Sequence, residues 1–455
     1  MPNMDSVPPT HEKRPPAHDG LPVIGNTHQL VREQEGLFEA AAAHGDVVRL
    51  RLLGMGEMHL VNHPDVAESV LTDTERFQKA AQTQEDLGDL LGQGLLLSDG
   101  DLWERQRERI QPAFYMEQIA DYTDTMATAI QQSADEWTGR PVVNIEDEMK
   151  ALTLRILVKS IFGSEVDYEG KNIRETVRAL QEPGQPMKQP IARMVPKWVP
   201  IPMWQRYKRG IREMESVIEM FVEARRGNVA DHDDLLSRLL ASTDEDGEGM
   251  SEKLLRDELM TFLFAGHETT ATALTFTWYL LSQNRAIERR LVAELDEVLD
   301  SGAASFADLP NLEYTEQVIR EAMRVYPPVP HIPRETTEPV QLDGYSIPKG
   351  SKVAPSQWTI HHDERFWESP YDFRPERFGE ERDRPQLAYF PFGAGPRRCI
   401  GQQFAMVEAK LILATLAGQY HLELVSDPDI DLSVSITTRP LDDIEMRVEP
   451  RETTG

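Results

Sequence analysis

The sequence predicts a mainly α-helical protein with small β-sheets, folded as one large helical domain. From about residue 100 to residue 330, apolar residues recur with the period of amphipathic helices, as in 126–137. Residues 251–284 run without a proline, which predicts a helix long enough to cross a whole domain. Strand-like pieces are short and occur only later, at 340–356 and 420–426.

The number of domains is predicted from the length of the chain and from whether linkers or repeats divide it. A chain of 455 residues is longer than a usual domain, so length alone favours more than one. However, the helical pattern continues through 286–301, and the sequence contains no internal repeat and no linker between two cores. We therefore predict a flexible, Pro-rich arm at 1–19, a single domain at 20–450 and a short tail at 451–455.

The long helix at 251–284 carries its own start signal. The preceding loop is acidic and ends at Ser251, a good N-cap residue that is followed by acidic residues in the first turn. Inside the helix, Gly266 costs about 1 kcal/mol relative to alanine, so another interaction should compensate for it. One interpretation of Gly266 is a small residue where two helices cross; the alternative is a role at a functional site.

The net charge is strongly negative. The chain has 77 acidic and 48 basic residues, for a formal net charge of −29. A surface with this charge repels phosphates, which argues against nucleic-acid binding. The charge is explained either by solubility or by a cytoplasm with molar salt, where screening suppresses self-repulsion. Few lysines with abundant Asp and Glu resemble proteins of salt-accumulating halophiles, which favours a halophilic archaeon as the source.

No targeting or membrane signal is found in the sequence. Residues 1–20 lack the apolar stretch of a secretion signal. No segment approaches the roughly 20 apolar residues that span a bilayer. We therefore expect a cytoplasmic protein.

The single cysteine, Cys399, lies in the glycine-rich stretch FPFGAGPRRCIGQQ. One cysteine forms no internal disulfide, and a lone cysteine is more often an inert buried side chain than a ligand. Its surroundings favour a ligand. The residues after it read as a helix, whose N-terminus stabilises a thiolate, and Arg397 and Arg398 add positive potential. A thiolate beside flexible glycines suits the axial position of an iron porphyrin.

Five residues of this stretch resemble the haem-binding loop of the cytochrome P450 family, F-x-x-G-x-R-x-C-x-G: Phe392, Gly395, Arg397, Cys399 and Gly401. Four further signatures follow the family's order, namely WERQR (103–107), AGHETT (265–270), EAMR (321–324) and FRPERF (373–378). The resemblance covers roughly residues 20–450.

The resemblance implies a cytochrome P450 fold with haem b (iron protoporphyrin IX) as cofactor and Cys399 as its metal ligand. It implies that buried anionic propionates are bound by cationic and indole N–H groups. The implied cofactor-binding residues are Trp103, Arg107, Ala265, Gly266, Arg334, Phe392, Gly393, Arg397, Cys399 and Gly401. Among them, Ala265 and Gly266 would make room for dioxygen.

Glu268 and Thr269 resemble the family's acid–alcohol pair, which implies catalytic roles: Thr269 would donate a hydrogen bond to bound dioxygen, and Glu268 would supply protons. This pair favours a dioxygen-activating monooxygenase. The alternatives are a peroxide-driven hydroxylase, whose relatives lack such a pair, and a non-enzymatic haem sensor or gas-binding protein. Glu321, Arg324 and Arg377 resemble the family's structural triad, in which the first two residues pair at i, i+3 on one helix.

The partners are also implied. No flavin or iron–sulfur domain follows residue 450, so electrons should come from a separate ferredoxin or flavodoxin. The substrate should be an apolar small molecule. Residues 77–114 resemble the branch with bacterial fatty-acid hydroxylases, and an archaeal host would make terpenoids or carotenoids equally good candidates.

Residues 183–212 are basic and Pro-rich and contain no acidic residue, within a chain of net charge −29. One interpretation is a connector whose aromatic residues pack on the protein body. The family resemblance implies instead a lid over the substrate channel. Its apolar side chains, including Trp198 and Trp204, and its basic rim would suit a long apolar substrate or peripheral contact with an anionic membrane.

Overall fold

The computed structural model describes most of the chain. The described residues are 13–163, 176, 179–180, 195, 197–232, 234–242, 249–299, 303–379, 383–434 and 436–451. The predicted tail at 451–455 and arm at 1–19 lie partly outside these ranges, so their structure is described only from residue 13 and up to residue 451.

Helices make up most of the described chain, as the sequence predicts. The α-helices are α1 (Thr27–Arg32), α2 (Gln34–Ala42), α3 (Pro64–Thr72), α4 (Ala81–Leu91), α5 (Gly100–Ile110), α6 (Met116–Trp137), α7 (Ile145–Ile161), α9 (Pro202–Arg226), α10 (Leu235–Ala241), α11 (Glu252–Gln283), α12 (Arg285–Val298), α13 (Glu313–Val325), α14 (Gln357–His361) and α15 (Gln402–Gln419). Short 3₁₀ helices lie at η1 (Gln111–Phe114), η4 (Val229–Asp231), η5 (Phe306–Asn311), η6 (Pro375–Phe378) and η7 (Gln386–Ala388).

The strands form small sheets. They are β1 (Val47–Leu52), β2 (Gly56–Val61), β3 (Phe77–Lys79), β4 (Val142–Asn144), β5 (Arg334–Thr336), β6 (Val340–Leu342), β7 (Tyr345–Ile347), β8 (Lys352–Pro355), β9 (Tyr420–Leu424), β10 (Leu432–Val434), β11 (Thr438–Pro440) and β12 (Glu445–Pro450). The largest sheet has the order β1-β2-β8-β5-β3. The prediction that strands occur only late in the chain was wrong, because β1 to β4 precede residue 150.

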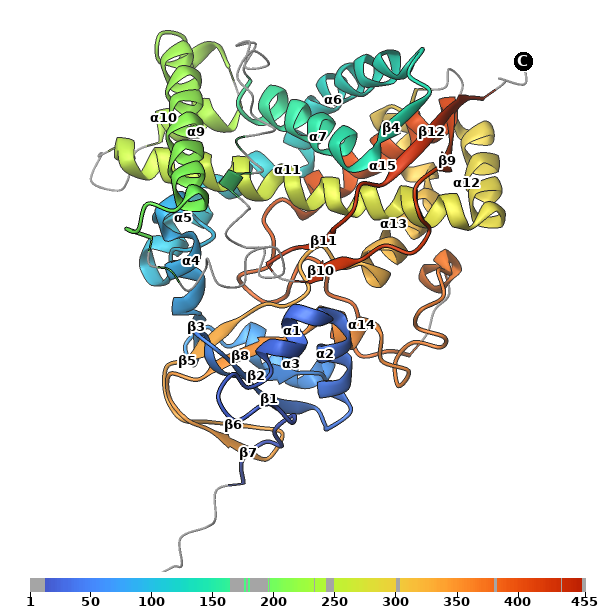
Figure 1. Ribbon diagram of the computed structural model, residues 1–455. Coiled ribbons are helices and arrows are strands. Elements are labelled where there is room, and N and C mark those ends of the chain that lie inside the picture. Colours follow the sequence, from blue (N-terminus) through green and yellow to red (C-terminus); the bar gives the residue numbers. More distant parts are fainter. Residues whose placement is uncertain are drawn as a thin grey trace, which may run out of the picture.

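Helix α11 crosses the helical part of the molecule, with α6 and α7 on one side of it (Figure 1). Ser251 caps it by accepting a hydrogen bond from the Leu254 N–H at 3.2 Å, as the sequence predicts. Most side chains of α11 between Leu255 and Leu281 are buried, which is the pattern of a helix enclosed on all sides. The five-stranded sheet and helices α1 to α3 lie together at the other end of the molecule (Figure 1).

The close contact between α11 and α7 explains Gly266. A Cβ atom built on this glycine would lie 3.0 Å from Cδ1 of Leu157 on α7. Glycine therefore lets the two helices approach, and their packing offsets its low helix propensity. The Cβ direction of Gly266 leads into the α7 crossing, while a role of Gly266 beside a cofactor stays a prediction. The interpretation as a small residue at a helix crossing is the one that the geometry supports.

The basic segment 183–212 is described only in part, since 183–194 and 196 lie outside the described residues. Trp204 at the start of α9 is buried, and its indole N–H donates to the Val195 carbonyl at 2.9 Å. Lys197 pairs with Asp89 on α4 at 2.8 Å. Trp198, which lies between Lys197 and Trp204 in the sequence, is 79% exposed. Packing on the protein body thus accounts for Trp204 and leaves Trp198 at the surface.

None of the helices within the described ranges combines the length and the apolar character needed to cross a bilayer.

We predict that Gly266→Val lowers the free energy of unfolding by about 1–3 kcal/mol, because the added methyl groups overpack the α7 crossing. The loss should be smaller in a Leu157→Ala background, which removes the clashing atoms. Chemical denaturation of the four variants measures this coupling. Gly88→Val is the matched control, since that helical glycine in α4 has no atom within 4 Å of its Cβ position. Equal losses of unfolding free energy in Gly266→Val and Gly88→Val would contradict the assignment of Gly266 to the helix crossing.

Candidate active site

The loop that carries Cys399 is a rigid turn. The Cys399 N–H donates to the Phe392 carbonyl at 2.9 Å, and the Gly393 N–H donates to the Phe390 carbonyl at 2.8 Å. Gly393 and Gly395 adopt φ angles of 71° and 68°, in the left-handed region that favours glycine. A Cβ on Gly395 would also lie 2.5 Å from the Leu71 carbonyl oxygen. The glycines therefore let the loop fold tightly against α3.

Helix α15 follows the loop, as the sequence predicts, and Gly401 is its N-cap residue. Burial raises the pKa of the Cys399 thiol, while a backbone hydrogen bond from Gly401 and the charges of Arg107 and Arg398 lower it. The Cys399 side chain is nevertheless exposed. A thiol that keeps exposed surface although protein atoms surround it lines an internal space of the protein. The helix N-terminus and the two cations therefore favour the thiolate and oppose the effect of burial.

Cys399 has no neighbouring group of protein ligands. Within the described residues, no three His, Cys, Asp or Glu side chains gather at a position that could hold a metal ion. A metal bound at Cys399 would have to bring its remaining ligands with it, as the iron of a porphyrin does. The accessible thiol, the tight loop and the helix N-terminus fit such a group.

A cluster of buried cations lies where β3 and β5 pair. Lys79 and Arg334 face each other in the strand register, and Arg397 from the Cys399 loop reaches the same place. Arg397 pairs with Asp99 and donates to the Phe77 carbonyl at 3.1 Å. Asp99 also accepts from the Lys79 backbone N–H at 3.0 Å. The sequence prediction contained Arg334 and Arg397 but missed Lys79 and Asp99.

The cluster holds excess positive charge. Burial, and then the charge of Arg397, lower the pKa of Lys79 to about 7. The same two causes lower the pKa of Arg334 to about 10. Asp99 offsets both shifts in part, and for Lys79 the nearby Glu258 does so too. Anionic groups bound here would favour the charged forms of Lys79 and Arg334. Buried carboxylates of a cofactor, in turn, require such cations.

Helix α5 contributes Trp103 and Arg107. The guanidinium of Arg397 lies 6.0 Å from the centre of the Trp103 ring. Arg107 donates to the Arg398 carbonyl at 2.7 Å, which joins α5 to the Cys399 loop. Burial lowers the pKa of Arg107, and the Cys399 charge opposes that shift. Trp103 therefore lies beside the cation cluster, whereas the hydrogen bond of Arg107 connects it to the Cys399 loop.

The middle of α11 presents a partly exposed face. Ala265 and Thr269, one turn apart, keep some exposed surface within a helix that is otherwise mostly buried. The Thr269 hydroxyl donates to the Ala265 carbonyl at 3.1 Å. Glu268 is buried, and its carboxylate meets the C-terminal hairpin, where Thr437 donates to it at 3.4 Å and Arg439 lies 3.7 Å away. The sequence prediction missed both hairpin residues.

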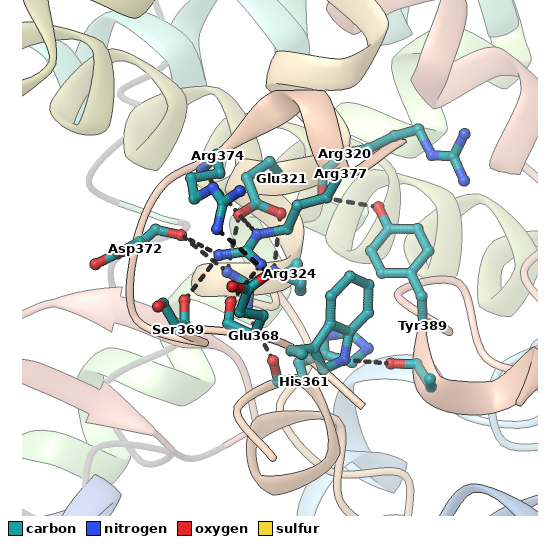
Figure 2. Close-up of polar contacts among 12 residues, drawn as sticks. Arg320, Glu321, Arg324, His361, Glu368, Ser369, Asp372, Arg374, Arg377 and Tyr389 are labelled. Carbon is teal, nitrogen blue, oxygen red and sulfur yellow. Dashed lines mark hydrogen bonds and ion pairs between the residues drawn. The ribbon is translucent and has the colours of Figure 1, made fainter. Parts of the chain in front are cut away.

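Glu321, Arg324 and Arg377 form one buried ion cluster, shown in Figure 2. Arg324 donates to the two oxygens of Glu321 at 2.8 Å and 2.9 Å, and Arg377 donates to Oε1 at 3.0 Å. All three side chains are at most 2% exposed. The remaining guanidinium N–H groups donate to backbone carbonyls of 361–372, including His361 at 2.7 Å. The cluster therefore joins α13 to the segment that precedes the Cys399 loop.

We predict that Glu321→Ala lowers the free energy of unfolding by about 3–5 kcal/mol, because it leaves two buried arginines without their carboxylate. Chemical denaturation measures the loss, and the haem absorbance per chain measures whether the chain still incorporates a porphyrin. Glu252→Ala is the matched control, since Glu252 pairs with Arg226 at an exposed position and should matter by less than about 1 kcal/mol. A soluble, stable and haem-loaded Glu321→Ala protein would contradict the assignment.

The chain is similar to known proteins over nearly its whole length. Residues 15–443 match the family described as "Cytochrome P450". Cyclooctatin synthase of Streptomyces melanosporofaciens is 33% identical over 97% of this chain and 96% of its own length. Cyclooctat-9-en-7-ol 5-monooxygenase of the same organism is 34% identical over 90% and 89% of the two chains, and pentalenene oxygenase of Streptomyces avermitilis is 30% identical over 91% and 92%.

The names of the last two relatives describe oxygenases, which confirms the predicted enzyme class. The family uses haem and dioxygen, takes apolar substrates and receives electrons from a redox partner. The comparisons do not test the source in a halophilic archaeon, which stays a prediction. Both the family match and the identities of the relatives extend over nearly the whole sequence, so this chain belongs to the cytochrome P450 family.

Proposed function

We propose that the protein is a haem b monooxygenase that uses dioxygen to hydroxylate a C–H bond of a terpenoid, with electrons from a separate ferredoxin-type protein. The observation that carries the proposal is the pair of Glu268 and Thr269 in the middle of α11, in a chain whose only thiol is the accessible Cys399. A thiolate ligand suits dioxygen activation, and an acid beside an alcohol suits controlled proton supply.

The choice of a terpenoid rests on the relatives. Two of them are named for cyclooctat-9-en-7-ol and for pentalenene, and the chain matches each along nine tenths of its length. This favours cyclic terpenoids over the fatty acids and carotenoids that the sequence left open. Pocket shape decides specificity within one fold, so the substrate itself is assigned only to this class.

The residues divide into two tasks. Cys399 would bind the haem iron, and Lys79, Arg334 and Arg397 would bind the propionates together with Trp103 and Arg107. When bound, haem supplies the activation of dioxygen and the transfer of one oxygen atom to the substrate.

On the side of α11, Ala265 leaves space for dioxygen. The Thr269 hydroxyl can turn from its carbonyl partner to donate a hydrogen bond, and Glu268 carries protons.

The electron source is proposed from the surface around the Cys399 loop. Arg398 is exposed there, and Arg107 lies beside it. A small acidic protein such as a ferredoxin or flavodoxin would complement these cations. Contact of Trp198 with an anionic membrane is proposed separately, on the exposure of its indole in a basic segment.

We expect the haem-loaded enzyme, supplied with ferredoxin, a ferredoxin reductase and NAD(P)H, to oxidise members of a cyclic terpenoid panel. Isotopically labelled dioxygen should place one labelled atom in the product, and mass spectrometry measures it. Product with peroxide alone would indicate the peroxide-driven alternative. Carbon monoxide binding without product under either condition would indicate a sensor or gas carrier. Spin-state shifts with fatty acids and with no terpenoid would contradict the substrate class.

We also expect Thr269→Ala to lower the product formed per electron consumed by about tenfold and to raise peroxide release, because the hydroxyl that supports proton delivery is lost. Thr275→Ala is the matched control: its hydroxyl makes the same bond to the carbonyl four residues back, at 2.7 Å, in a buried part of α11. Equal coupling of electrons to product in both variants would count against a role of Thr269.

A further inference from the structure

The α4–α5 loop, residues 92–98, is docked against the first half of α11. The Gln93 N–H donates to the Asp257 carboxylate at 2.9 Å. A Cβ atom on Gly92 would overlap the same carboxylate, and a Cβ atom on Gly94 would lie 2.5 Å from the Asp257 carbonyl oxygen. The loop therefore reaches this position only because neither glycine carries a side chain.

Both backbone polar groups of Leu95, in the middle of this loop, are bound by charged side chains. Glu258 on α11 accepts the Leu95 N–H at 3.0 Å, and Lys79 at the end of β3 donates to the Leu95 carbonyl at 2.7 Å. The Glu258 side chain is fully buried, so its hydrogen bond to the loop offsets part of the cost of burying a carboxylate. Leu95 thus joins α11 to β3.

Lys79 also belongs to the cation cluster, where it pairs in register with Arg334. Burial, and then the charge of Arg397, lower its pKa to about 7; the charge of Arg334 acts in the same direction, and those of Asp99 and Glu258 oppose it. Whether the ammonium is charged near neutral pH is therefore decided by the charges beside it. An anion at the cluster favours the charged ammonium.

The charge of Glu258 depends on that ammonium in turn. Burial raises the pKa of Glu258 to about 7, and the charge of Asp257 adds to this; the Leu95 hydrogen bond, the charge of Lys79 and the side chain of Gln106 oppose it. Hydrogen bonds to charged groups are the stronger ones. An anion that favours charged Lys79 therefore strengthens the bonds on both sides of Leu95.

We propose that the α4–α5 loop retains the cofactor: Lys79 and Glu258 couple the binding of the haem carboxylates at the cation cluster to the docking of the loop on α11, and the docked loop slows the loss of haem. The coupling is reciprocal, since a group that stabilises the docked loop is itself bound more tightly when the loop is docked. This inference rests on the proposed binding of the haem carboxylates by the cluster.

Gly94→Ala tests the coupling without altering a charge. The added methyl group would overlap the Thr261 hydroxyl and lie 2.5 Å from the Asp257 carbonyl oxygen, so the loop must move away from α11. Gly88→Ala in α4 is the matched control, because its Cβ position meets none of the described atoms within 4 Å. Mass spectrometry measures hydrogen exchange of the 92–98 amides. The absorbance change on transfer of haem to excess apomyoglobin measures the rate of haem loss from the loaded enzyme.

We expect Gly94→Ala to speed both the exchange of the 92–98 amides and the loss of haem by about fivefold or more, and Gly88→Ala to match the wild type. In a Lys79→Met background, Gly94→Ala should change haem loss by less than about twofold, because the connection from the loop to the cluster is already removed. Unchanged exchange in Gly94→Ala would overturn the proposal. So would faster exchange with unchanged haem loss, or equal acceleration of haem loss in both backgrounds.

Glu258→Gln decides the proposal if Gly94→Ala does not fold. It keeps the shape of the side chain and removes its charge, so we expect haem loss to become several-fold faster. Glu148→Gln is the matched control, because Glu148 is a buried carboxylate of α7 that accepts the Trp137 indole N–H at 2.9 Å. Haem loss at the same rate in both variants would contradict the coupling.

Failure of the proposed function gives a different result. If the wild type oxidised no terpenoid, the monooxygenase assignment would fail, and the rates of haem loss would still test the coupling. If Lys79→Met alone lost haem as slowly as the wild type, the proposed role of the cluster would fail, and the coupling with it. If Lys79→Met lost haem faster and Gly94→Ala did not, the cluster would keep its role and the coupling would be wrong.

Discussion

The position of Cys399 depends on the burial of one carboxylate, Glu321, between two arginines. Arg324 uses the rest of its guanidinium to hold the His361 carbonyl at 2.7 Å, and His361 Nε2 accepts the Phe390 N–H at 3.2 Å. Phe390 begins the Cys399 loop. His361 is able to accept because burial, reinforced by the Arg324 charge, keeps its pKa well below the usual value and its ring neutral. The charged cluster thereby fixes the start of the loop through a neutral histidine.

The charge of the cation cluster is opposite to that of the chain as a whole. The chain as a whole carries −29, which would repel carboxylates at the surface. Inside, Lys79, Arg334 and Arg397 concentrate positive charge where solvent and salt screen it little. Burial, and then the charge of Arg397, lower the pKa of Lys79 and of Arg334, so a bound anion would favour the charged forms of both side chains.

Local patterns in the sequence predicted many of the helices and the contacts between residues that are close in the sequence. The Ser251 cap, the helix after Cys399 and the Glu321–Arg324 pair each depend on residues a few positions apart. Contacts between distant segments could not be predicted in this way. Asp99 meets Arg397 across 298 positions, and Arg439 reaches Glu268 only because β10 and β11 are anchored elsewhere. The strands β1 to β3 were missed for the same reason, since their sheet is completed by β5 and β8.

The side chains of Glu268 and Thr269 leave α11 in different directions, although the two residues are neighbours. Successive side chains on a helix point about 100° apart, so the backbone of α11 cannot aim both at one place. Thr269 faces the partly exposed side of the helix, and Glu268 faces the β10–β11 hairpin. The direction of the Glu268 carboxylate is therefore set by a hairpin 169 positions further along the chain, through a hydrogen bond from Thr437 at 3.4 Å and the guanidinium of Arg439 at 3.7 Å.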